Sequence, residues 1–115
     1  MAVKNSIQAI PVSTFNSAGL DALIYAPVNV GGLPDACFEI IISNFSTTGM
    51  IYSFDGVTDN GYTNPEQVLI LRGGNGASQP NNSTALWSKG TILYVRGTAG
   101  TGLIVLSGLY QNQGA

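Results

Sequence analysis

Apolar residues recur at every second position along most of the chain, in short runs that end at Gly, Pro, Asn or Ser. This alternation is typical of half-buried β-strands, because successive side chains of a strand point to opposite faces of a sheet. No window of about 11 residues shows the apolar spacing of an amphipathic helix. Strands are expected at residues 6–15, 20–28, 37–45, 50–54, 67–72, 91–96 and 103–110.

The spacing of these runs constrains the architecture. Seven or eight short strands, separated by about 8–12 residues, predict an all-β fold: a single-domain antiparallel β-sandwich, jelly-roll-like, over residues 1–115. Pro11 lacks a backbone donor and indicates an edge strand or a break. Residues 1–11 are interpreted as an extended N-terminal arm that lies along a neighbouring subunit. Residues 91–96 and 103–110 are expected to pair as a hairpin, and residues 73–84 to form a long loop.

The composition explains how such a chain stays folded with few charges. Charged residues make up 9% of the 115 residues and hydrophobic residues 44%. Soluble domains average about 25% charged residues. The hydrophobic content shows that the chain is not a disordered polar segment, and Gly, Asn, Ser and Thr replace the missing charges. A surface poor in charge suits contact with other protein subunits, because the centres of protein interfaces are depleted in charged residues.

The same counts argue against several functions. Four basic residues and a net charge of −2 cannot neutralise the phosphates of a nucleic-acid partner. The chain has no His, which removes the commonest general base and metal ligand, and Cys37 is its only cysteine. We expect no cofactor, no metal site and no enzymatic activity. Without an apolar run of about 18 residues or a secretory signal, we also expect no membrane partner and synthesis in a reducing cytoplasm.

Polar clusters are read as turns. Asp55, Asp59 and Asn60 would supply several oxygen ligands to Ca²⁺, but they match turns whose Asx side chains bond their own backbone more closely. The glycines at residues 73–76 and 97–102 fit no phosphate-binding motif. Carboxylate pairs such as Asp35 with Glu39 have no neighbour in the sequence that would orient them for acid–base chemistry.

Aromatic and N-terminal apolar residues are the candidates for partner contact. Tyr52, Tyr62 and Trp87 are interpreted either as a sugar-stacking face or, preferably, as core and subunit-interface residues. We expect the partner contacts to include Ile7, Ile10, Pro11, Tyr62 and Trp87.

Two stretches carry a resemblance to a known group of proteins. Residues 51–59 read IYSFDGVTD and are followed by Tyr62, and residues 87–110 read WSKGTILYVRGTAGTGLIVLSGLY. Together they resemble small β-structured virion proteins of tailed bacteriophages. The resemblance covers about half of the chain, residues 51–110, and assigns no binding residues.

This resemblance implies a structural role in a virus particle. Among such proteins, a head cement or decoration protein fits the chain length best, and these often sit on the outer surface of the capsid as homotrimers that join major capsid protein subunits. The expected function is therefore shell stabilisation, with the major capsid protein and further copies of the chain as partners. A head fibre, neck or baseplate/tail component is the alternative within this class. A carbohydrate-binding β-sandwich module is the alternative outside it.

Overall fold

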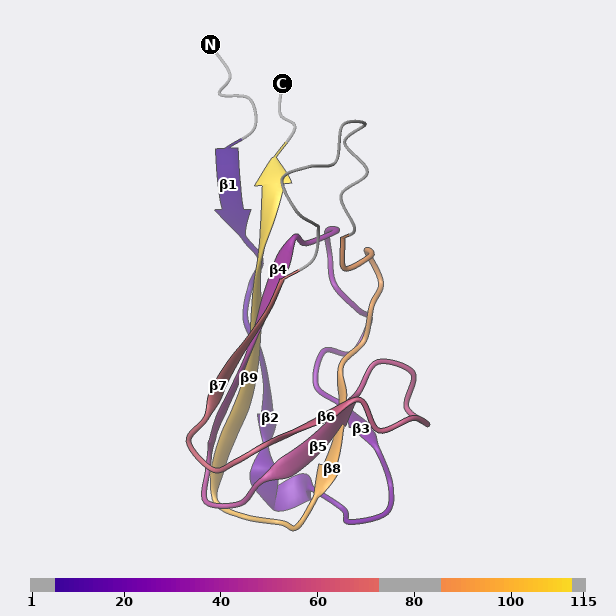
Figure 1. The fold of residues 1–115 in the computed structure, drawn as a ribbon, viewed down its shortest axis with the longest axis vertical. Helices are drawn as coiled ribbons and strands as arrows, with labels where there is room; N and C mark the ends of the chain where they lie inside the picture. The colour runs from indigo at the N-terminus through magenta and orange to yellow at the C-terminus, as the bar shows by residue number, and fades with distance from the viewer. Residues whose placement is uncertain (1–5, 73–85, 113–115) are drawn as a thin grey trace.

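The computed structural model describes residues 6–72 and 86–112, which contain nine strands and one short 3-10 helix. The elements are β1 (Ser6–Ala9), β2 (Ser13–Asn16), η1 (Ser17–Gly19), β3 (Ala26–Pro27), β4 (Glu39–Ser46), β5 (Met50–Ser53), β6 (Gly61–Thr63), β7 (Val68–Arg72), β8 (Tyr94–Gly97) and β9 (Gly102–Asn112). They form two antiparallel sheets packed as a sandwich, with β1 and the end of β9 projecting together from one end (Figure 1). The all-β sandwich predicted from the alternation is confirmed.

The order of strands is jelly-roll-like, as expected. One sheet runs β1-β9-β4-β7, with β2 also paired to β9, and the other runs β3-β8-β5-β6. β1 and β2 pair with successive parts of β9, so they act as one strand broken around Pro11. From β2 onward, the chain changes sheet at every connection between consecutive strands except that between β5 and β6. The two sheets of a jelly roll enclose a hydrophobic core between them without any helix.

The core lies between the two sheets. Ile40 and Ile42 of β4 and Ile104 of β9 are at most 1% exposed. They face Met50 and Val95 of the second sheet, both fully buried. Because side chains alternate along each strand, these inward positions leave the residues between them on the outer side of the sandwich.

A buried polar network joins β4 to the β4–β5 turn and to the end of β6. The Asn44 side chain, fully buried, donates through Nδ2 to the backbone oxygens of Thr48 (3.0 Å) and Asn64 (3.2 Å) and to Oγ1 of Thr63 (3.2 Å). Its Oδ1 accepts the backbone N–H of Ser46 at 3.1 Å. One side chain therefore holds β4, the β4–β5 turn and the segment after β6 in register.

Several sequence expectations are wrong in detail. Residues 91–96 and 103–110 do not form a hairpin: β8 pairs with β3 and β5, whereas β9 belongs to the opposite sheet. The glycine-rich connection between them crosses from one sheet to the other. The hairpin was expected because turn residues predict a chain reversal, but they do not predict which sheet receives the next strand. Of the strand expected at residues 20–28, only β3 is observed, and β6 forms at residues 61–63, where no strand was expected. The loop expected at residues 73–84 lies outside the described residues.

Part of the expected N-terminal arm lies in the sandwich itself. Residues 6–9 form β1, an edge strand that pairs with β9 of the same chain. Residues 1–5 lie outside the described part of the chain. Within the described residues, no helix is long and apolar enough to cross a membrane.

Candidate functional site

The outer face of the β1-β9-β4-β7 sheet presents apolar side chains to the surroundings. The pairing register places Ile41 of β4 beside Ile70 of β7 and Ser107 of β9, and Phe45 beside Leu103. Because paired residues share a face, alternation extends this set across the sheet. We call it the outer face: Ile7, Ala9, Thr14, Asn16, Glu39, Ile41, Ser43, Phe45, Val68, Ile70, Arg72, Leu103, Val105, Ser107, Leu109 and Gln111.

The large side chains at the centre and one end of the outer face are open to solvent. Phe45 is 56% exposed, Ile70 52% and Leu103 44%. The charged members of the outer face are Glu39 and Arg72, which form an ion pair with 3.2 Å between Oε1 and Nε. The solvated face of an antiparallel sheet ordinarily carries polar residues. The outer face departs from this pattern, because its largest exposed side chains are apolar.

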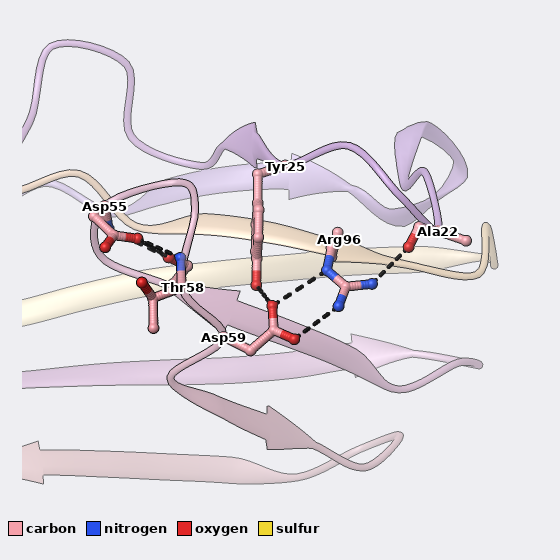
Figure 2. A network of polar contacts seen from close by, with 7 residues as sticks. Ala22, Tyr25, Asp55, Thr58, Asp59 and Arg96 are labelled. Carbon is pink, nitrogen blue, oxygen red and sulfur yellow. Dashed lines mark hydrogen bonds and ion pairs between the residues drawn. The ribbon is translucent and has the colours of Figure 1, made fainter.

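The opposite side of the molecule carries a polar network (Figure 2). Arg96 of β8 donates through Nη2 to Oδ2 of Asp59 at 2.8 Å and through Nη1 to the backbone oxygen of Ala22 at 2.6 Å. The Tyr25 hydroxyl donates to Oδ1 of Asp59, and the guanidinium carbon lies 5.5 Å from the centre of the Tyr25 ring. Arg96 thus joins the segment before β3 to the loop between β5 and β6.

The electrostatics of this network favour a structural clamp. Desolvation and the hydrogen bond to Asp59 raise the pKa of Tyr25, so its hydroxyl stays protonated at neutral pH. Hydrogen bonds from Tyr25 and Arg96 lower the pKa of Asp59, so its carboxylate stays charged. The Asp59 carboxylate is already paired with the Arg96 guanidinium, and the Tyr25 hydroxyl donates to the same carboxylate. The arrangement therefore fixes two loops and leaves no unpaired acid or base at this point for catalysis.

A shallow hollow adjoins the network. Leu23, Ile24 and Val57 line it together with the network side chains. Leu23 is 85% exposed and Val57 82% exposed. We call Leu23, Ile24 and Val57 the loop patch, a small apolar surface on the side of the sandwich opposite the outer face.

The acidic loop is a turn closed by the Asp55 side chain. Oδ1 of Asp55 accepts the backbone N–H groups of Val57 (2.8 Å) and Thr58 (2.7 Å) and the hydroxyl of Ser53 (2.8 Å). These bonds, with those from the backbone of Thr58 and Val57 foremost, hold the pKa of Asp55 well below its usual range. Among residues 6–72 and 86–112, no cluster of three or more His, Cys, Asp or Glu could hold a metal ion.

The five contact residues expected from the sequence do not converge on one surface. Ile7 is 65% exposed on β1, and Pro11 is exposed beside it. Ile10 is 5% exposed and belongs to the chain's own core. Tyr62 is exposed on β6, in the other sheet, and Trp87 is half-buried.

The aromatic residues do not form a sugar-stacking platform. Tyr52 is buried in the core. The Trp87 ring stacks on Phe54 at 4.8 Å between ring centres, and its Nε1 donates to the backbone oxygen of Leu71 at 3.2 Å. Trp87 and Tyr52 are therefore core and support residues, and Tyr62 is the one of the three whose ring is mostly exposed.

The outer face is the feature that reasoning from single motifs overlooks. Its signal is present in the sequence as runs that are apolar at nearly every position, such as EIII within residues 39–42 and VLIL within residues 68–71. Continuous apolar runs are typical of strands covered on both faces. In this sandwich the core covers only one face of β4 and β7, so the other apolar face of these strands is left uncovered within the chain.

No protein-family model matches the chain, and no curated protein and no solved structure matches it either.

Proposed function

We propose that this protein is a structural component of a virus particle, most specifically a cement or decoration protein on the outer surface of a tailed-phage head. The observation that carries the proposal is the exposed apolar outer face, with Phe45, Ile70 and Val68 each more than half exposed. A surface of this kind is stabilised when a neighbouring subunit covers it. The resemblance of residues 51–110 to phage virion proteins specifies the kind of assembly.

The mechanism is the burial of surface at seams between subunits. Two surfaces are available, the outer face and the loop patch, and they lie on opposite sides of the sandwich. A small domain with two such surfaces can join two neighbours, one through each. Individual contacts can be weak, since many copies on one shell add them into a large avidity. The major capsid protein and further copies of this chain are the proposed partners.

The paired charges fit this role. Arg96 and Asp59 neutralise each other at the loop patch, and Glu39 and Arg72 do so at the end of the outer face. Neither surface therefore requires a partner with a strong opposite charge. Assembly through such surfaces is expected to persist at high salt. Salt screens interactions between charges, but it weakens the free energy gained from burying apolar area very little.

The proposal is tested by counting copies in purified particles. Quantitative mass spectrometry of virions that carry this protein is expected to give a copy number comparable with that of the major capsid protein. A few to a few tens of copies would instead assign it to the neck, tail or baseplate. Its absence from particles would contradict a virion role altogether.

A binding experiment tests the mechanism. Purified protein is added to particles that lack it, and the bound fraction is measured after sedimentation in low and high salt. Saturable binding that survives high salt is expected. Binding that disappears at high salt would show that charge, and not apolar burial, holds the protein to the shell.

A further inference from the structure

We propose that the outer face is covered by the outer face of a second copy of this chain, so that the assembling unit is a two-fold dimer. This inference specifies one partner of the proposed assembly role and in that sense rests on it. The two sheets would stack face to face at about 10 Å, as sheets do inside a sandwich. The Ile41 and Ile70 side chains of the two copies would then lie in a common apolar layer.

The area of the outer face fits a weak, concentration-dependent dimer. Four strand positions, with β1 and β2 sharing one, span about 19 Å at about 4.8 Å per strand. The seven residues from Glu39 to Phe45 in β4 span about 24 Å at about 3.4 Å per residue. The product is about 450 Å² of footprint per copy, so two copies bury about 900 Å². The projecting β1–β9 ribbon adds nothing, because a two-fold axis through the middle of the face places it beyond the Phe45–Leu103 end of the other copy. A total of about 900 Å² lies at the low end of the size range of biological interfaces, which is typical of weak association.

The chemistry of the outer face is complementary to itself. Its centre consists of Ile41, Ile70, Val105 and the small Ser43 and Ser107. Two such centres meet without leaving a charge unpaired.

The charges at the end of the outer face are also compatible with a second copy. Glu39 and Arg72 already neutralise each other within one chain. A two-fold axis through the middle of the face places this pair against the uncharged Phe45–Leu103 end of the other copy. A net charge of −2 per chain adds little long-range repulsion.

The symmetry follows from the use of one patch by both partners. A surface that binds itself is isologous and closes as a two-fold dimer, whereas a ring of three needs two different surfaces on each subunit. The outer face therefore favours a dimer over the homotrimer that the phage resemblance implies. The loop patch, on the opposite side of each copy, remains free for a subunit of another kind.

The experiment measures the mass of the full-length protein by sedimentation velocity and light scattering between about 1 and 100 μM. The wild type is expected to be a dimer at the upper end of this range. Ile70→Lys places an ammonium group at the centre of both copies of the interface and is expected to weaken association by about 100-fold or more. Ile24→Lys is the matched control: it makes the same substitution at a 66% exposed residue of the loop patch, against 52% for Ile70. The control is expected to dimerise as the wild type does.

Each result decides the inference. Circular dichroism first establishes that both variants are folded. A wild type that is monomeric throughout, a trimeric mass, or dimers that survive Ile70→Lys would overturn the two-fold interface. Loss of dimers in Ile24→Lys alone would move the interface to the loop patch and also overturn it. A monomer found at high copy number in particles would refute this inference alone, whereas a dimer absent from particles would refute the proposed function alone.

Discussion

Replacing Asn44 with Ala is expected to be among the most destabilising single changes in this protein. The side chain is fully buried and its two amide hydrogens are shared among three acceptors, while its oxygen accepts the Ser46 N–H. Truncation to a methyl group removes all four contacts at once. Water cannot replace them easily, because Ser46 and Thr63 are themselves buried.

The magnitude follows from the groups left without partners. A buried donor or acceptor that loses its partner costs about 1–3 kcal/mol. The Ser46 N–H loses its acceptor outright, whereas the Thr48 and Asn64 oxygens each lose one donor. We therefore expect a loss of about 4 kcal/mol in the free energy of unfolding. Since domains of this size are stable by about 5–15 kcal/mol, this is a large share of the total.

The assay is urea unfolding followed by Trp87 fluorescence at one fixed protein concentration, because association of the folded chain would raise its apparent stability. With a slope of about 2 kcal/mol per molar urea, the midpoint falls by about 2 M. Asn16→Ala is the control: Asn16 is exposed and its Oδ1 accepts a single bond, from the Ala18 N–H at 2.9 Å. It is expected to cost about 1 kcal/mol. If the Asn44 variant loses no more than the Asn16 variant, the buried network does not stabilise the fold as argued.

Three further outcomes are expected. The pKa of Asp55 is lower in the folded chain than its unfolded-state value near 4, so the ionised carboxylate stabilises the fold above that pH. This stability is lost as the pH falls towards the folded pKa. Asp55→Ala is therefore expected to be less stable than the wild type at pH 7 but to lose less stability between about pH 5 and 2, and parallel losses in urea midpoint would contradict this. Gly102→Ala is expected to lower the free energy of unfolding in urea by about 3 kcal/mol, because Gly102 has φ 125° and the new Cβ would clash with the Phe45 backbone oxygen. Gly31→Ala is the control: Gly31 has φ 92° but no atom near the new Cβ, so a cost of about 1 kcal/mol is expected. Equal costs would refute the clash. Cys37 is fully buried and burial raises its pKa, so a thiol reagent such as DTNB is expected to modify the folded protein only slowly and the urea-unfolded protein at once; immediate reaction of the folded chain would contradict the burial.

The strands were predictable where alternation and turn residues agree. The run at residues 37–45 gives β4, and Pro11 gives the break between β1 and β2. The partners of β8 and β9 were not predictable, because pairing depends on which face of which sheet each strand covers and not on the turn that joins them. β6 was missed since its three residues, Gly61–Thr63, are too few to show a period.

The surface features were harder to predict than the strands, for two different reasons. Tyr25, Asp59 and Arg96 are far apart in the sequence, and only the packing of β3 beside β8 brings them together. The contact residues chosen from the sequence were picked as single apolar or aromatic side chains. Ile10 shows the weakness of that choice, because an apolar residue beside a break can as readily turn inward.

The three consecutive isoleucines of β4 connect the sequence to the proposed assembly. Ile40 and Ile42 lie in the core, and alternation then forces Ile41 outward, between Ile70 and Ser107. The fold does not need isoleucine at this position, since a polar β-branched residue such as Thr suits a strand equally well. An outward apolar residue lowers solubility unless it is covered. A sandwich supplies two layers, and in the dimer proposed above the second copy supplies a third layer over Ile41.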